Sequence, residues 1–174
     1  VGALAGVSLS VGVFSGAAFV DDDFFELIIF LAGALSDSSS RGEASGFFFG
    51  GFLEHMGRAV YQGVFDPSSI HADEFGCRTD VLAALRELEF TVMRYPGGNF
   101  VSNYHWRDGV GPVTERPTRR ELAWGTIEPN TFGTNEFLSL TERMGWSPMF
   151  AVNLGTGTPE EAADWVEYTN GNST

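Results

Sequence analysis

Glu54 is the first residue whose type and position suggest chemistry. It ends a run of apolar residues and glycines, GFFFGGFL, at residues 46–53. A carboxylate at the end of such a run can accept hydrogen bonds from the hydroxyl groups of a sugar. It can equally pair with Arg58, which follows one helical turn later. Position alone leaves both interpretations open.

The stretch RYPGGNF at residues 94–100 supplies two further candidates, Arg94 and Asn99. Arg94 lies inside an apolar segment, where a buried arginine needs a partner, either a ligand or a carboxylate such as Glu54. Asn99 offers a donor and an acceptor together, which suits a hydroxyl group. It could instead be a turn residue, because Asn tolerates left-handed backbone angles. Gly97 and Gly98 weaken that alternative, since they already supply unusual angles.

Two tryptophans, Trp106 and Trp124, lie in a long connecting segment at residues 100–133. Each could stack on the apolar face of a sugar ring or could pack within the segment itself. The segment is too rich in aromatic residues for disorder, and connections of this length are usually functional or disordered. We therefore expect it to fold over the mouth of a binding site.

Alternating strands and helices must position these side chains. Apolar runs predict strands at 46–52, 91–95 and 147–155, and helical periodicity predicts helices at 79–90, 134–145 and 158–168. This order indicates an α/β fold in which parallel strands are joined by crossover helices. The third strand is almost continuously apolar, which predicts burial on both faces. In such folds the chemistry gathers at the carboxyl ends of the strands.

The start of the third helix is the most clearly marked. Thr158 is the expected cap, Pro159 takes the first helical position, and Glu161 completes a capping box. The preceding GTGT at 155–158 resembles part of a dinucleotide loop, but Glu160 stands where the third glycine belongs. A carboxylate there would repel a phosphate, so no nucleotide cofactor is predicted.

Composition excludes several classes of function. The chain has 174 residues and a net charge of −13, which argues against nucleic acid or an anionic membrane as a partner. The three histidines, His55, His71 and His105, are scattered and predict no metal site. Cys77 is the single cysteine, so no internal disulfide can form. A chain of this length favours one domain or part of one.

The first 45 residues match no motif and stay unassigned, whereas residues 46–174 carry the strand and helix rhythm. No positively charged segment precedes the apolar start, so it is a poor signal peptide. The apolar stretch 24–35 is too short to span a bilayer and contains Glu26. Residues 36–46 have the composition of a linker. We expect a cytoplasmic rather than a secreted protein.

Four longer motifs give a more specific signal than any single residue. They are FLEHMGRAVYQGVFDP (52–67), RYPGGNFVSNYHWRDGVGP (94–112), LAWGTIEPNTFGTNEF (122–137) and AVNLGTGTPEEAADWVEY (151–168). In this order and at these intervals they closely resemble the α-L-arabinofuranosidases of glycoside hydrolase family 51. The resemblance extends from about residue 49 to 170, and residues 1–45 do not share it.

The resemblance implies a (β/α)8 barrel of which this chain would hold the first three βα units, truncated before closure. It implies retaining hydrolysis that releases terminal non-reducing α-L-arabinofuranosyl residues from arabinan, arabinoxylan or their oligosaccharides. The acid/base and nucleophile glutamates would both come after Thr174. Glu136, in FGTNEF, would open the second helix and would not be the acid.

The resemblance also assigns sugar-binding roles. Glu54, Arg94, Asn99 and Trp124 match positions that line the arabinose site, and His55 is expected to support Glu54. No cofactor or metal is implied, and the full-length enzyme would be a homo-oligomer, often a hexamer.

Two alternatives from other classes remain. One is a carbohydrate-binding remnant without catalysis, and the other is a related barrel glycosidase that acts on another sugar or as an endo-enzyme. The chain alone, lacking barrel walls, is expected to be poorly soluble and inactive.

Overall fold

The computed structural model describes residues 17–18, 28–31 and 49–171. The linker predicted at 36–46 lies outside these residues, as does most of the unassigned first segment. Strand β2, at Ile28–Leu31, falls within the apolar stretch that the sequence left without a role.

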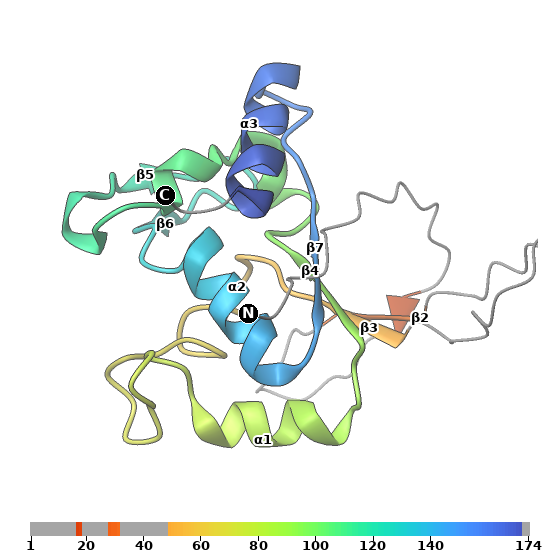
Figure 1. Ribbon diagram of the computed structural model, residues 1–174. Coiled ribbons are helices and arrows are strands. Elements are labelled where there is room, and N and C mark those ends of the chain that lie inside the picture. Colours follow the sequence, from red (N-terminus) through yellow and green to blue (C-terminus); the bar gives the residue numbers. More distant parts are fainter. Residues whose placement is uncertain (1–16, 19–27, 32–48, 172–174) are drawn as a thin grey trace, which may run out of the picture.

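One five-stranded sheet organises the chain (Figure 1). Its order is β1 (Ala17–Ala18), β2 (Ile28–Leu31), β3 (Phe49–Phe52), β4 (Val92–Tyr95) and β7 (Ser147–Phe150). The three strands predicted from the sequence, β3, β4 and β7, pair in parallel. The α/β class with a parallel sheet is therefore confirmed. Strands β1 and β2 extend this sheet with antiparallel pairs that the sequence did not predict.

A helix follows each of these three strands. They are α1 (Thr79–Glu87), α2 (Thr134–Met144) and α3 (Pro159–Asn170). Helices α1 and α2 form because apolar side chains recur on one face and are buried there, as Leu82 and Leu85 are in α1. Helix α2 ends at Gly145, whose φ of 72° is the left-handed conformation that glycine adopts without strain. Within the described residues no helix is long and apolar enough to cross a membrane.

The connection between β4 and α2 is ordered by short elements. It contains three 3₁₀ turns, η1 (Phe100–Asn103), η2 (Trp106–Gly109) and η3 (Val113–Glu115). A small hairpin follows, made of β5 (Arg119–Arg120) and β6 (Ile127–Glu128). The segment is structured, as its aromatic content predicted.

The prediction for the third strand was partly wrong. Strand β7 ends at Phe150 rather than at residue 155, and none of its residues is fully buried. It is the last strand of the described sheet, so only β4 covers one of its edges. The apolar run continues beyond Phe150 as a turn, in which the Asn153 side chain accepts from the backbone N–H of Gly155 and Thr156 at 3.0 and 2.9 Å.

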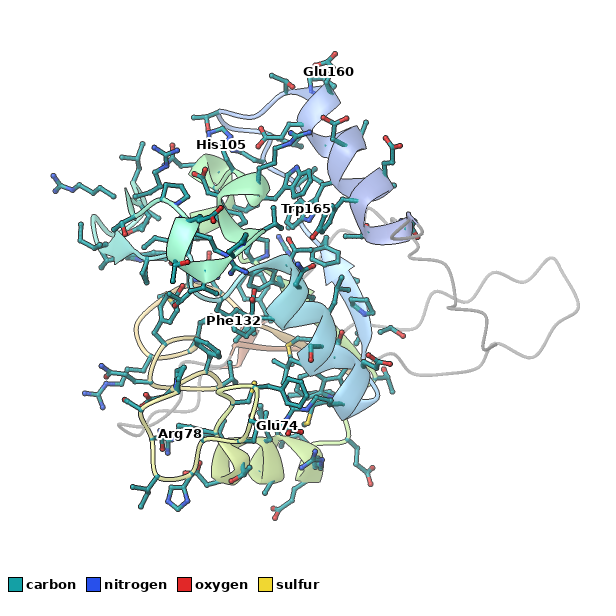
Figure 2. The ribbon with its side chains drawn as sticks, turned by 60° about the vertical axis from the view of Figure 1, so that its left-hand side comes forward. Glu74, Arg78, His105, Phe132, Glu160 and Trp165 are labelled. Atoms are coloured by element: carbon teal, nitrogen blue, oxygen red, sulfur yellow. The ribbon has the colours of Figure 1, made fainter. Side chains whose placement is uncertain are left out.

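Two buried clusters hold the elements together. The larger lies between the sheet and helices α1 and α2, and Tyr95, Phe132 and Phe137 are its fully buried aromatic members. Figure 2 shows Phe132 in the middle of the molecule, between Arg78 at one end and His105 at the other. The smaller cluster joins the 100–109 segment to α3 through Phe100, Tyr104, Trp106 and Trp165. Trp106 stacks on Trp165 with an interplanar angle of 2°, so of its two interpretations packing is confirmed.

Candidate functional site

Glu54 lies at the carboxyl end of β3 and is buried, with 6% of its surface exposed. Its Oε1 accepts hydrogen bonds from the backbone N–H of Gly98 at 2.7 Å and of Phe100 at 3.1 Å. The carboxylate therefore clamps the loop that leaves β4, on either side of Asn99. The alternative pairing with Arg58 is not observed: Arg58 is exposed and forms no ion pair with Glu54 in the described residues.

Gly97 allows this clamp to close. Its φ is +143°, a backbone conformation that other residues rarely adopt. A Cβ at Gly97 would lie 2.3 Å from Cγ of Glu54 and 2.6 Å from its Oε1, which is closer than any side chain tolerates. At Gly98 the nearest atom would be 3.5 Å away, an ordinary contact. Of the two glycines, Gly97 is the one that the geometry requires.

Arg94, on β4, is half-buried beside this clamp. Its guanidinium lies 4.8 Å from the centre of the Phe52 ring and donates a hydrogen bond to the Gly97 carbonyl at 3.2 Å. Burial lowers the pKa of Arg94, and the negative charge of Glu54 opposes that shift. The arginine thus has its partner in the loop backbone and places a positive charge near the carboxylate.

Asn99 is exposed at the centre of the clamped loop. Its φ of −68° and ψ of −41° are right-handed helical angles, so the alternative of a left-handed turn residue is wrong. In the described part of the chain its side chain makes no cap hydrogen bond to η1. An exposed primary amide on a fixed loop offers both a donor and an acceptor, so it can bind a hydroxyl group.

His55 does not support Glu54 as expected. The side chain is buried, and its Nδ1 lies 2.9 Å from Oε2 of Glu128 on β6. The other ring nitrogen, Nε2, lies 2.9 Å from the hydroxyl of Tyr95 on β4. Glu128 was missed in the sequence, where the only signal was a glutamate in an alternating strand pattern beside exposed Ile127.

Trp124 lies in the turn between β5 and β6 and is 39% exposed. The turn is built around Glu121, whose carboxylate accepts from the backbone N–H of Ala123, Trp124 and Thr126 at 2.7 to 3.1 Å. Burial raises the pKa of Glu121, whereas these hydrogen bonds lower it. The hydrogen bonds have the larger combined effect, so the pKa lies below its ordinary value. Glu121 was also missed, although its buried carboxylate fixes the position of Trp124.

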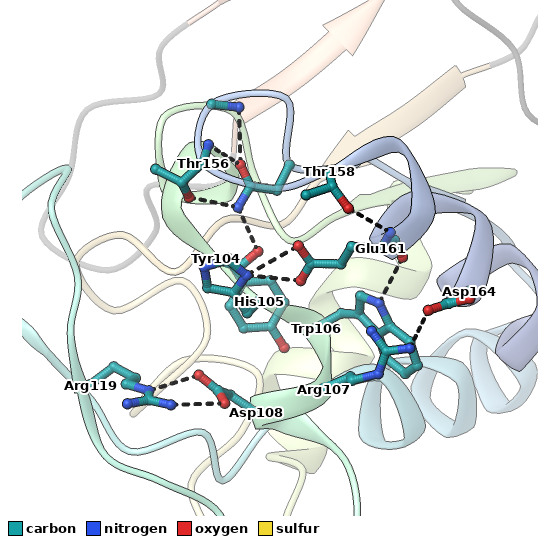
Figure 3. Close-up of polar contacts among 12 residues, drawn as sticks. Tyr104, His105, Trp106, Arg107, Asp108, Arg119, Thr156, Thr158, Glu161 and Asp164 are labelled. Atoms are coloured by element: carbon teal, nitrogen blue, oxygen red, sulfur yellow. Dashed lines mark hydrogen bonds and ion pairs between the residues drawn. The ribbon is translucent and has the colours of Figure 1, made fainter.

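Figure 3 shows how the 100–109 segment is attached to α3. His105 Nδ1 lies 2.9 Å from Oε1 of Glu161, and the Trp106 indole donates to the Glu161 carbonyl at 3.0 Å. Thr158 caps the helix as predicted, because its hydroxyl accepts from the Glu161 backbone N–H at 3.1 Å. The predicted capping box is incomplete, since the carboxylate of Glu161 binds His105 and not the backbone of Thr158.

Glu136 is occupied structurally. It accepts two hydrogen bonds from Arg116, at 2.8 and 3.1 Å, and one from the backbone N–H of Gly133 at 2.8 Å. The carboxylate therefore closes the first turn of α2, where the sequence placed it. A cavity of about 10 Å³ beside Trp106 and Trp165 is too small for a sugar.

The structure thus brings Glu54, Arg94 and Asn99 together at the carboxyl ends of β3 and β4. Trp124 belongs to a separate hairpin, which is joined to β3 through the contact between His55 and Glu128. The group offers a carboxylate, an amide, a guanidinium and an exposed indole, which are the usual contacts of a sugar. In the part of the chain that the structure describes, no three potential metal ligands cluster.

Known proteins match the same region. A family model for the alpha-L-arabinofuranosidase 1 domain matches residues 84–174. A probable alpha-L-arabinofuranosidase C of Aspergillus terreus is 57% identical over 123 residues, which are 71% of this chain and 24% of that protein. An intracellular exo-alpha-(1->5)-L-arabinofuranosidase 1 of Bacillus subtilis is 51% identical over 129 residues, covering 74% of this chain and 26% of that protein. The chain spans about a quarter of the length of these relatives.

Solved structures agree. An alpha-L-arabinofuranosidase of Thermotoga maritima in complex with arabinose superimposes with a TM-score of 0.68 at 47% identity, over 71% of this chain and 26% of that one. A family 51 alpha-L-arabinofuranosidase of Bifidobacterium longum gives 0.69 at 50% identity, over 71% and 24%.

Proposed function

Because the chain belongs to the α-L-arabinofuranosidases of glycoside hydrolase family 51, we propose that it supplies the sugar-holding half of a retaining arabinofuranosidase active site. The substrate is a terminal non-reducing α-L-arabinofuranosyl residue of an arabinan, an arabinoxylan or their oligosaccharides. The three βα units are the first part of a (β/α)8 barrel, and later strands of the full-length protein close it.

One observation carries this proposal more than any other. The buried Glu54 carboxylate uses Oε1 to hold the loop that presents Asn99, and within the described residues Oε2 accepts no hydrogen bond. A carboxylate oxygen that no protein donor occupies can accept a hydrogen bond from a sugar hydroxyl. Asn99 then contacts a second hydroxyl, Arg94 contributes positive charge, and Trp124 provides an apolar wall.

The reaction itself needs two more carboxyl groups, roughly 5 Å apart. We place both on later strands of the same barrel, beyond Thr174. One protonates the leaving glycosidic oxygen, and the other attacks the anomeric carbon and forms a glycosyl-enzyme. The first group then activates the water that releases arabinose. Glu54 and Asn99 orient the sugar ring for both steps.

The full-length enzyme works inside the cell on imported oligosaccharides and needs no cofactor. The name of the Bacillus subtilis relative, an intracellular exo-enzyme, supports this location and an exo mode of attack. The arabinose bound by the Thermotoga maritima enzyme supports the sugar class. A homo-oligomer, as the family resemblance implies, is proposed for the full-length protein.

The test is to assay the full-length protein with 4-nitrophenyl α-L-arabinofuranoside, with the corresponding β-D-xyloside as the matched control. We expect rapid release of nitrophenol from the first substrate only. The configuration of the first product, followed by proton NMR, should be retained. Preference for the xyloside, or inversion of configuration, would replace this function by another barrel glycosidase.

A further inference from the structure

We propose that His55 is a positioning residue that fixes the three segments of the sugar site relative to one another. This inference rests on the proposed function, because it concerns the placement of Glu54, Asn99 and Trp124. His55 touches none of the substrate atoms that these residues would contact. It acts through the segments that carry them.

The first connection runs from His55 to the hairpin of Trp124. Nδ1 lies 2.9 Å from Oε2 of Glu128, and the two side chains are only 2% and 6% exposed. The other oxygen of Glu128 accepts from the Tyr61 hydroxyl and, at 2.7 Å, from the backbone N–H of Asn130. Glu128 therefore holds β6, which begins three residues after Trp124, against the end of β3.

The second connection runs from His55 to the loop of Asn99. The imidazole stacks on the Phe100 ring at 4.5 Å between centroids and 15° between planes. Its Nε2 lies 2.9 Å from the Tyr95 hydroxyl, and that hydroxyl lies 3.3 Å from the carbonyl of Phe132, at the end of the long connecting segment. His55, which directly follows Glu54, is thus in contact with both sides of the Asn99 loop, through Tyr95 and Phe100.

The chemistry of these contacts requires an imidazole. Nδ1 lies within ion-pair distance of the Glu128 carboxylate but forms no hydrogen bond there, whereas Nε2 is hydrogen-bonded to the Tyr95 hydroxyl. The flat ring also fills the space above Phe100. An asparagine can keep a polar group near the Nδ1 position but loses the stacking and the Tyr95 contact. A phenylalanine keeps the stacking and loses both polar contacts. Buried networks of this kind can be apportioned only by double-mutant cycles.

The experiment uses the full-length enzyme and its kcat and KM on 4-nitrophenyl α-L-arabinofuranoside. Glu128→Gln keeps the size of the side chain but removes the charge that faces His55. We expect it to raise KM and to lower kcat/KM by about tenfold, and Trp124→Ala to do the same. If Glu128 acts by placing Trp124, the two losses in kcat/KM should not multiply. The loss in the double variant should be at least about threefold smaller than the product of the two single losses.

A matched control separates positioning from general stability. Asp73, in the segment before α1, and Arg143, on α2, form an ion pair that includes neither His55 nor Glu128 nor Trp124. Asp73→Asn should lower the melting temperature, leave KM unchanged, and combine with Trp124→Ala multiplicatively. Where Glu128→Gln does not fold, His55→Asn and His55→Phe serve in the same cycle, and the asparagine variant should retain more of the coupling to Trp124.

The outcomes are distinct. Multiplicative combination of Glu128→Gln or the His55 variants with Trp124→Ala would overturn the positioning role while leaving the sugar site intact. If Glu54→Gln and Asn99→Ala both leave the arabinofuranoside kinetics unchanged, it is the proposed function that fails.

Discussion

Glu54 holds the loop that leaves β4 with one carboxylate oxygen, and this makes its surroundings sensitive to small changes. Oε1 accepts two backbone hydrogen bonds from that loop, and in the proposed function the same carboxylate binds the sugar. The close approach of the loop depends on Gly97, whose missing Cβ leaves room for the Glu54 side chain.

The two adjacent glycines provide a matched pair of substitutions. Gly97→Ala places a methyl group 2.3 Å from Glu54 Cγ and strains a φ of +143°, a backbone cost of roughly 1–3 kcal/mol. We expect kcat/KM of the full-length enzyme to fall by more than about tenfold. Gly98→Ala, with its nearest contact at 3.5 Å, should be close to wild type. Equal effects of the two substitutions would contradict the clamp.

Glu121 predicts a dependence on pH. Its folded pKa lies below the ordinary value of 4.5, so its stabilising effect is fully present above that pH and is lost as the pH falls through the folded pKa. Wild type should therefore melt at a higher temperature than Glu121→Gln at pH 7, and the difference should narrow below pH 4.5. A constant difference would exclude the ionised carboxylate as the cause.

Among the elements, the three helices and the strands β3 and β4 follow from sequence pattern because local signals and packing agree. The β5–β6 hairpin and the 3₁₀ turns were not predicted. The apolar face of α1, Gly145 after α2 and Thr158 before α3 each mark an element correctly. Strand β7 was overextended, since an apolar run does not reveal where Asn153 turns the backbone away from the sheet. Local pattern cannot indicate such a side-chain hydrogen bond.

The candidate site was only partly predictable for a similar reason. Glu54 and Asn99 follow strands, so their neighbourhood can be expected from topology. The contact between His55 and Glu128 joins residues that are 73 positions apart by their numbering, and no local signal relates them. Trp106 is buried because Trp165 of α3 stacks on it, whereas Trp124 lies in the turn between β5 and β6 and is exposed. The sequence does not show which tryptophan α3 will cover.

The cap of α3 gives a prediction at this scale. Thr158→Ala removes the acceptor for the Glu161 backbone N–H and should cost about 1 kcal/mol. Amide exchange in the first turn of α3 should accelerate roughly fivefold. Thr158→Ser keeps the hydroxyl and should restore most of the protection. Equal exchange in all three proteins would show that the contact of His105 with Glu161 holds the helix without the cap.

At the scale of the whole molecule, β7 is the last strand of the described sheet, and its residues are partly exposed. An unpaired strand edge promotes association with other chains. We predict that residues 49–171, produced alone, associate through this edge and hydrolyse no 4-nitrophenyl α-L-arabinofuranoside. Light scattering and the nitrophenol assay measure both properties. A monodisperse piece with measurable hydrolysis would place the catalytic carboxylates within these residues.

The kinetics of Glu54→Gln in the full-length enzyme test most directly whether this carboxylate binds the sugar. The glutamine oxygen can still accept from Gly98 and Phe100, so the loop stays in place while the charge that faces the sugar is lost. We predict a melting temperature unchanged within a few degrees and a fall in kcat/KM for 4-nitrophenyl α-L-arabinofuranoside of about 10- to 100-fold. Wild-type kinetics in a folded Glu54→Gln enzyme would contradict the claim that this carboxylate binds the substrate.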